Sequence, residues 1–339
     1  MSKPLADPRV LFLGSPPFAL PSLRALEAAT TLVGVISQPD RPAGRGRRVA
    51  APAVARYARE RGLPLWQPPR LRTPAAIQRI TDLAPDVLVT VAYGRIIPAE
   101  VLAIPPLGAL NAHPSLLPAY RGASPIQRAI ADGQTETGVT IIFQTEALDA
   151  GDIILQQRVA IGPEETAGQL ETRLADLAAG ILLEAVRLVA EGRAPRRAQE
   201  EAAATYVGKL TKEHGRIDWR QPARAIASLV RAMDPWPSAY TTRGGGLLKI
   251  WGARPTEMWR LPPEEAAPAP GGRLEPGTVL AVSEEGILLQ TGDGALSVLE
   301  VQPEGGRRMD AGAYARGHRV RAGERWGAPD LPGAARALC

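Results

Sequence analysis

Short apolar runs alternate with amphipathic stretches along the first half of the chain. The runs are too short for helices and are typical of buried strands; they are Arg9–Gly14, Thr31–Ser37, Asp86–Ala92, Gly108–His113, Gly138–Gln144 and Asp152–Ile161. Between and after them, apolar residues recur at helical spacing over about Pro17–Ala29, Ala51–Gly62, Thr73–Leu83 and Thr166–Glu191. This alternation predicts an α/β domain with a doubly wound, mostly parallel, Rossmann-like sheet.

The pattern changes in the second half of the chain. Residues 193–207 are rich in Ala, Arg and Glu and include Pro195, which is typical of a linker. Next come a predicted helix at Pro222–Arg231 and short strands between Gly, Pro and acidic turns, at Leu247–Ala253, Gly277–Val282, Gly286–Gln290 and Leu296–Gln302. Such strands predict a small β-barrel, for which the OB type is a candidate. We therefore expect an α/β domain over residues 1–192, a linker over 193–207 and a β-barrel domain over 208–339.

The composition restricts the class of protein. The chain has 339 residues, of which 45% are apolar and 22% charged, and this is unlike a disordered chain. Its one cysteine, Cys339, excludes a disulfide framework, and its three histidines are far apart, so no metal site is expected. No apolar run approaches the ~20 residues of a membrane span, and no charged and then apolar leader opens the chain. We expect a soluble, cytoplasmic protein without membrane contact.

The turn after the first predicted strand is the position at which a dinucleotide cofactor would bind. A dinucleotide site needs G-x-G-x-x-G, because glycines let the main chain approach a pyrophosphate. The turn at Gly14–Phe18 reads G-S-P-P-F instead, and the phosphate-binding pattern G-x-x-x-x-G-K-[ST] is absent from the chain. This excludes a nicotinamide or flavin cofactor and a P-loop enzyme.

The densest group of chemically capable residues surrounds Asn111, the only asparagine of the chain. Asn111 and His113 lie two residues apart at the end of a predicted strand, so their side chains project to the same side. Open α/β sheets bind ligands at the carboxyl ends of their parallel strands. Asp149, in a loop between two predicted strands, is a third candidate.

An amide, an imidazole and a carboxylate suit acyl transfer. The amide can stabilise an oxyanion, the imidazole can move a proton, and the carboxylate can orient the imidazole. The chain has no G-x-S-x-G turn and its only cysteine is terminal, so we expect direct attack by an acceptor amine rather than a covalent enzyme intermediate. Taken singly, a chance asparagine in a turn, a buried structural histidine and a turn-capping Asp149 remain open alternatives.

The segments Asn111–Pro118 (NAHPSLLP) and Leu148–Asp152 (LDAGD) resemble the signature of folate-dependent formyltransferases. Further segments resemble the branch of that family that acts on methionyl-tRNA: Phe12–Phe18, Gln38–Gly46, Val91–Gly94, Tyr120–Ile126, Lys209–Glu213, Ile217–Trp219, Pro235–Tyr240 and Arg316–His318. The resemblance covers nearly the whole chain.

The resemblance implies transfer of the formyl group of 10-formyltetrahydrofolate to the α-amine of initiator methionyl-tRNA. Asn111 would then donate to the formyl oxygen, and His113 would stabilise that oxygen and assist proton transfer to the folate nitrogen. Asp149 would hold the imidazole and take part in removing the amine proton. Two short segments would line the folate pocket: Val91, Ala92, Tyr93, Gly94, Ser115, Leu116, Leu117 and Pro118.

A cluster of arginines is expected to bind the tRNA. Arg41, Arg45, Arg47 and Arg48 fall within eight residues, in a segment similar to the family loop that inserts at the acceptor end of the tRNA. Arginines in such a loop can bind phosphate groups. The second domain is expected to contact the acceptor arm by charge and shape, as is usual for stem RNA. A monomer is expected.

Other functions are consistent with some of these features. A formyltransferase acting on a nucleotide-linked amino sugar could share the whole first domain, and one acting on a purine intermediate would need no second domain. Hydrolysis of formylfolate is a third alternative function, since water can replace the amine as the attacking group. A non-catalytic RNA-binding protein would have no reason to combine Asn111, His113 and Asp149. The Arg41–Arg48 segment and the strand-rich second half favour the tRNA acceptor.

Overall fold

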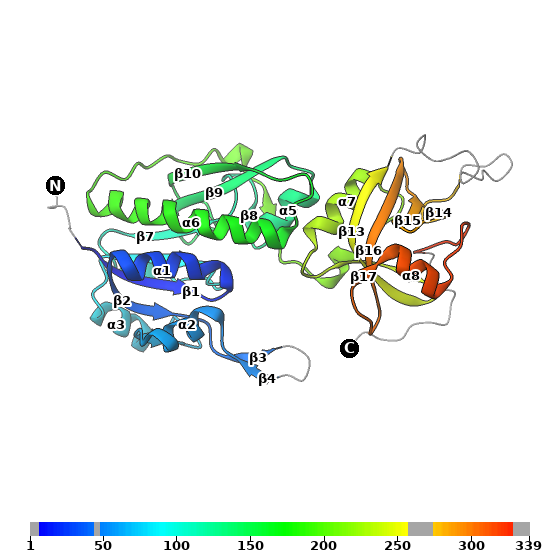
Figure 1. Cartoon of the computed structure of the whole chain (residues 1–339). Helices are drawn as coiled ribbons and strands as arrows, with labels where there is room; N and C mark the ends of the chain where they lie inside the picture. Colours follow the sequence, from blue (N-terminus) through cyan, green and yellow to red (C-terminus); the bar gives the residue numbers. More distant parts are fainter. Residues whose placement is uncertain (1–6, 44–47, 257–273, 328–339) are drawn as a thin grey trace. The chain divides into compact units, whose positions relative to one another are not determined.

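The computed structural model describes residues 7–43, 48–256 and 274–327, which form two compact units (Figure 1). The described residues of Met1–Ile126, Glu136–Ala160 and Gln169–Lys209 make the first unit. Those of Gln127–Thr135, Ile161–Gly168 and Leu210–Cys339 make the second. In this part of the chain, no helix is long and apolar enough to cross a membrane.

A seven-stranded sheet in the order β10-β9-β7-β6-β1-β2-β5 forms the centre of the first unit. Strands β5, β2, β1, β6 and β7 pair in parallel, whereas β9 is antiparallel to both β7 and β10. The bounds are β1 Arg9–Gly14, β2 Thr31–Ile36, β5 Leu65–Trp66, β6 Val87–Val91, β7 Ala109–His113, β9 Glu136–Phe143 and β10 Ile153–Ala160. The doubly wound, mostly parallel sheet predicted from the sequence is thereby confirmed.

Burial on both faces explains the uninterrupted apolar runs. In β1, Leu11 and Leu13 pack into one core, while Val10 and Phe12, which alternate with them, are also fully buried. The core on the side of Leu11 joins the sheet to α3 and α4, and its buried members are Leu11, Leu13, Ile36, Leu71, Ile80, Leu88, Tyr93, Ile97, Val101 and Ala109. The carboxyl ends of the parallel strands are therefore held by packing on both sides.

Four helices lie close to their predicted positions: α1 Leu20–Ala29, preceded by a 3-10 turn η1 at Pro17–Ala19, α2 Ala53–Arg61, α3 Pro74–Asp82 and α6 Ala167–Ala190. Two shorter helices, α4 Ala99–Leu102 and α5 Pro125–Ala131, were not predicted from the sequence. Helix α3 begins as the sequence indicates: Thr73 Oγ1 accepts a hydrogen bond from Ala76 N at 3.2 Å, and Pro74 occupies the first turn.

Short elements that the sequence did not predict complete the first unit. They are the hairpin of β3 Arg41–Ala43 with β4 Arg48–Ala50, the strands β8 Arg121–Gly122 and β11 Tyr206–Val207, and a 3-10 turn η2 at Glu201–Ala203. The β3–β4 hairpin projects from the rest of this unit (Figure 1). Strands β8 and β11 pair in parallel.

The second unit is built on an antiparallel sheet in the order β12-β13-β16-β15-β14, with β17 paired to β16. Its elements are η3 Lys212–Gly215, α7 Ala223–Ala232, β12 Ala239–Arg243, β13 Gly246–Thr256, β14 Val279–Val282, β15 Ile287–Gln290, β16 Ala295–Pro303, β17 Met309–Asp310 and α8 Ala311–His318. The buried indoles of Trp219 and Trp326 meet edge to face, with ring centres 6.4 Å apart. The expected strand-rich second domain is confirmed.

Candidate active site

Strand β7 positions the first two candidate residues. Asn111 pairs with Thr90 of β6 and Ile142 of β9, and His113 pairs with Thr140 of β9. A strand held between two neighbours is rigid, and residues two apart on it face the same way. Asn111 and His113 are both buried, so the spacing read from the sequence places an amide and an imidazole side by side at the carboxyl end of β7.

The turn between β9 and β10 brings in Asp149. Its main chain is left-handed, with φ of 50°. Two residues later, a Cβ on Gly151 would lie 1.7 Å from the carbonyl oxygen of Phe143, so only glycine fits there. The turn is thus packed tightly against the end of β9, and this returns the Asp149 carboxylate to the end of β7.

The Asp149 carboxylate contacts both side chains of β7. Its Oδ1 accepts a hydrogen bond from Asn111 Nδ2 at 3.2 Å, and its Oδ2 accepts one from Gly122 N at 2.9 Å. The same Oδ2 lies 3.6 Å from His113 Nδ1, within ion-pair distance but too long for a hydrogen bond. Because Nδ2 carries two hydrogens and this bond uses one, Asn111 retains a donor for another acceptor.

The His113 ring is oriented by its other nitrogen. Nε2 lies 2.8 Å from the carbonyl oxygen of Tyr120, which can only accept, so Nε2 carries a hydrogen. In the neutral ring, Nδ1 is then the nitrogen that can take up a proton, and it faces Asp149. The side chains of His113 and Asp149 are 5% and 13% exposed, so a charge formed on the ring would interact with the carboxylate more strongly than in water. The arrangement can stabilise an oxyanion and move a proton.

The segment predicted as a linker, residues 193–207, lies on the first unit. Arg197 forms an isolated antiparallel bridge with Ile153 of β10. Gln199 Nε2 donates to the carbonyl oxygens of Asp149 and Gly151, each at 2.8 Å. The sequence reasoning assigned Gln199 no role, and no local pattern marks it. The domain boundaries at 192 and 208 stay a prediction.

The residues expected to bind folate divide into two groups. Some have side chains that belong to the protein interior: Val91, Tyr93, Ser115 and Leu117 are buried, and Ser115 Oγ donates to the carbonyl oxygen of Ala119 at 2.6 Å. Burial raises the pKa of the Tyr93 phenol, so it remains neutral. The others, Ala92, Gly94, Leu116 and Pro118, are exposed or half-buried. A ligand in contact with both segments would therefore meet their main chain and small apolar surfaces.

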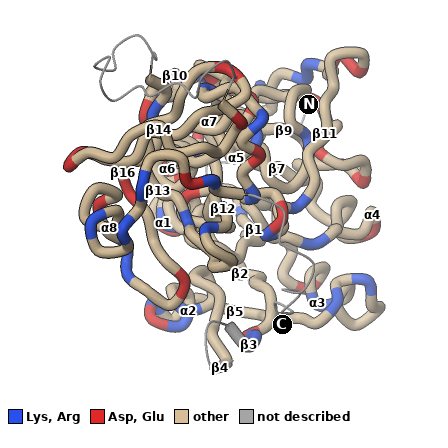
Figure 2. The backbone as a smooth tube through the Cα atoms, turned by 90° about the vertical axis from the view of Figure 1, so that its right-hand side faces the viewer, with Lys and Arg blue, Asp and Glu red and all other residues tan. Residues whose placement is uncertain are grey.

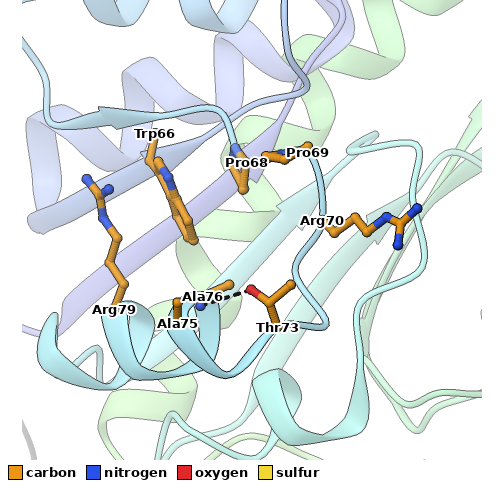
Figure 3. A pocket seen from close by; sticks show the side chains of 8 residues that line it. All are labelled: Trp66, Pro68, Pro69, Arg70, Thr73, Ala75, Ala76 and Arg79. Atoms are coloured by element: carbon orange, nitrogen blue, oxygen red, sulfur yellow. Dashed lines mark hydrogen bonds between the residues drawn. The ribbon is translucent and has the colours of Figure 1, made fainter.

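A separate hollow of about 330 Å³ opens beside β5 and the start of α3 (Figure 3). The ring of Trp66 forms one wall, and the guanidinium of Arg79 lies 4.7 Å from the centre of that ring on its other side. The remaining lining residues are Pro68, Pro69, Arg70, Thr73, Ala75 and Ala76. None of Asn111, His113 and Asp149 lines this hollow, so it is distinct from the candidate site.

The expected tRNA-binding arginines are only partly described. Arg41 is exposed on β3 and pairs across the hairpin with Ala50 of β4. Arg48 begins β4, whereas Arg45 and Arg47 lie outside the described residues. Among the described residues, no three His, Cys, Asp or Glu side chains gather where they could hold a metal ion.

Comparison with known proteins identifies the family of the chain. The formyl transferase family model matches residues 9–186, and the model of the formyl transferase C-terminal domain matches residues 209–319. The chain belongs to the formyl transferase family. The first match contains Asn111, His113 and Asp149 and the whole of the central sheet of the first unit.

Several relatives are named methionyl-tRNA formyltransferase. The protein from Symbiobacterium thermophilum is 46% identical over 326 residues, which are 96% of this formyl transferase and 97% of that protein. The protein from Moorella thermoacetica is 45% identical over 317 residues, or 93% and 98% of the two chains. The similarity thus includes both units.

Solved structures of lower identity share the fold. An N-formyltransferase from Helicobacter canadensis, in complex with folinic acid and dTDP-3-aminofucose, superposes with a TM-score of 0.62 at 17% identity, over 86% of this chain and 98% of that one. HypX from Aquifex aeolicus, in complex with tetrahydrofolic acid, gives a TM-score of 0.58 at 20% identity, over 91% of this chain and 47% of that one. This formyl transferase therefore spans about half the length of HypX.

Proposed function

We propose that this formyl transferase moves the formyl group of 10-formyltetrahydrofolate to the α-amino group of initiator methionyl-tRNA. The main observation in support of formyl transfer is that Asn111, His113 and Asp149 lie together at the carboxyl end of β7. The acceptor is supported by relatives of this name that match nearly the full length of the chain at 41% to 46% identity. We place the reaction in the cytoplasm, in a monomeric protein.

The reaction in this proposal is a direct acyl transfer. The amine nitrogen attacks the formyl carbon, and the bond from that carbon to N10 of the folate breaks after a tetrahedral intermediate. Asn111 donates the second hydrogen of Nδ2 to the formyl oxygen as its negative charge develops. One proton leaves the amine and one is added to N10. His113 and Asp149 assist these two transfers, with Asp149 stabilising the charged imidazole.

The proposed folate site lies on the two segments that border the catalytic residues. Gln38 Nε2 donates to the carbonyl oxygen of Tyr93 at 2.7 Å, which holds the first segment to the end of β2. Gly94, with φ of 77°, is exposed beside it and presents bare main chain. These features support recognition of a flat, polar pterin ring through main-chain groups.

Basic residues support the tRNA as acceptor. On the second unit, Arg307, Arg316, Arg319 and Arg321 are exposed on α8 and the loops around it. Figure 2 shows basic positions, in blue, at α8. Exposed arginines bind phosphates without reading the base sequence, which suits a double-stranded acceptor arm.

The direct test is transfer of labelled formyl from 10-formyltetrahydrofolate to methionyl initiator tRNA, with elongator methionyl-tRNA as the comparison. Transfer to the initiator tRNA alone is the expected result. Binding of folate without transfer to either tRNA would contradict the proposed acceptor and favour an amino sugar. Absence of folate binding would contradict the proposed donor.

Arg45→Ala is expected to raise the KM for tRNA while leaving folate binding unchanged. A guanidinium that neutralises phosphate charge contributes to binding through release of counterions, so its loss weakens tRNA binding most at low salt and makes the KM for tRNA less dependent on salt. Steady-state kinetics with each substrate varied in turn, at two salt concentrations, measure the effect. Arg24→Ala is the control, because Arg24 is a basic residue of α1 that lies over the ring of Tyr57. Equal losses for both substrates in the Arg45 variant would refute a role in tRNA binding.

A further inference from the structure

Residues 199–207, here called the strap, lie along the loop that follows the catalytic strand. Arg121 N donates to the carbonyl oxygen of Thr205 at 2.8 Å, and Ala123 N donates to that of Val207 at 3.0 Å. Together with the parallel pairing of β8 and β11, these bonds hold the loop to the strap by main-chain contacts. The strap is therefore part of the structure around the site.

The loop held by the strap makes two contacts with the catalytic residues. The Tyr120 carbonyl accepts from His113 Nε2, and Gly122 N donates to Asp149 Oδ2. Gly122 has φ of 114°, and a Cβ there would lie 2.2 Å from the carbonyl oxygen of Val207. Because loop and strap are this close, a displacement of the strap would move the partners of His113 and Asp149.

Gln199 makes a second connection, from the strap to the Asp149 turn. Its amide nitrogen has two hydrogens, and they are directed at the carbonyl oxygens of Asp149 and Gly151, each 2.8 Å away. The first of these carbonyls belongs to the peptide unit that directly follows the Asp149 Cα, and the second lies two residues further along the same turn. Gln199 thus fixes the turn without touching a reacting atom.

Arg121 determines which way the Gln199 amide points. Its Nε and Nη2 donate to Gln199 Oε1 at 3.2 and 3.0 Å, which leaves the amide nitrogen facing the turn. The Arg121 side chain is only 1% exposed, and its charge is balanced by Glu201, 2.9 Å away. Hydrogen bonding to Arg121 lowers the pKa of Glu201, so the counter-charge is present at neutral pH. A buried guanidinium, paired with an exposed carboxylate, therefore orients the half-buried amide of Gln199.

We propose that Gln199 is a positioning residue for Asp149, and that Arg121 holds Gln199 in the orientation this requires. The inference rests on the proposed formyl transfer, since it gives Gln199 a role in that reaction. In this arrangement the position of the strap, which lies in the segment predicted as a linker, determines the geometry of the Asp149 carboxylate.

Two substitutions of Gln199 test the proposal. Gln199→Glu keeps the shape and can pair with Arg121, but its carboxylate cannot donate to the two carbonyls. Gln199→Leu removes all the polar contacts. For both variants we expect kcat to fall between about tenfold and a hundredfold, with each KM changed less than about twofold, as for a displaced catalytic group. Thermal unfolding measured alongside reports any general loss of stability.

Gln290→Leu is the matched control. Gln290 Nε2 donates to two main-chain carbonyl oxygens of one turn, those of Thr291 at 2.8 Å and Gly294 at 3.3 Å, so it has the same kind of acceptors as Gln199. Gln290 lies on β15 of the second unit, which contains none of Asn111, His113 and Asp149. We expect its kcat to remain within about twofold of that of the unaltered protein.

A double-mutant cycle separates positioning from a structural role. If Gln199 acts through Asp149, Gln199→Leu lowers kcat in the unaltered protein but not in Asp149→Ala, measured in single turnovers. An equal loss in both backgrounds would overturn the proposal. A crystal structure of Gln199→Glu gives a readout that does not depend on the reaction: we expect the Asn111–Asp149 contact to be lost, and an unchanged turn would refute the inference. Failure of the unaltered protein to formylate tRNA would instead contradict the proposed function.

Discussion

Asp149→Asn is expected to lower kcat for formyl transfer about a thousandfold, within the range seen for groups that assist proton transfer. The substitution removes the negative charge that lies 3.6 Å from His113 Nδ1. It also breaks the local hydrogen bonding, because Asn111 and Gly122 each donate to a different carboxylate oxygen. An amide has one oxygen, so its nitrogen would face one of these donors. Single-turnover transfer to methionyl-tRNA measures the loss.

Asp152→Asn is the control for that experiment. Asp152 comes at the end of the same turn, but its side chain is 38% exposed and lies 3.7 Å from Arg196. Exposed ion pairs contribute little, so we expect kcat to change less than about threefold. Similar losses of kcat in both variants would show that the effect comes from distortion of the turn and not from the Asp149 carboxylate itself. An unchanged rate in Asp149→Asn would exclude Asp149 from the mechanism.

Asn111→Ala is expected to lower kcat about a hundredfold, the usual effect of removing one oxyanion donor. The contact with Asp149 occupies one hydrogen of Nδ2, and the alanine lacks the other one, which the transition state needs. The KM for 10-formyltetrahydrofolate should change little, because the lost interaction strengthens only as the oxygen becomes charged. Steady-state kinetics at saturating tRNA distinguish the two parameters.

The variant Asn111→Asp separates electrostatics from packing. It keeps the shape of the side chain but replaces the donor with a second carboxylate beside Asp149, whose Oδ1 lies 3.2 Å from Asn111 Nδ2. If Asn111 stabilises an oxyanion, Asn111→Asp loses more activity than Asn111→Ala. The opposite order would show that the alanine variant suffers from a cavity, and it would contradict the proposed role.

Most of the sheet of the first unit could be predicted because β1, β6, β7 and β9 are buried on both faces along nearly their whole length. Strand β1 begins and ends where its apolar run predicts, and β7 differs by one residue from its predicted start at Gly108. Strand β5 has only two residues at the edge of the sheet, and β12 reads Ala-Tyr-Thr-Thr-Arg, so neither has an apolar run. Their pairing is decided by neighbouring strands.

The candidate site was predictable where its residues share one element. Asn111 and His113 lie on a single strand, so the period of two places both side chains on one face. Asp149 is 38 residues from Asn111, and its approach depends on the antiparallel return of β9 beside β7 and on the close packing at Gly151. The sequence indicated Asp149 as a candidate in a loop between two predicted strands, but only the fold brings its carboxylate to within 3.2 Å of Asn111 Nδ2.

The sequence by itself determined the strand pattern, the identity of the amide, imidazole and carboxylate, and the family to which they point. Only the tertiary structure decided what holds them. Gln199 contacts the Asp149 turn across 50 residues, and the Arg121 guanidinium reaches Gln199 across 78. The atoms that Gln199 binds are main-chain carbonyls, which every residue has, so no choice of residue type in the turn marks the contact. Such a bond exists only once packing has brought the two segments together.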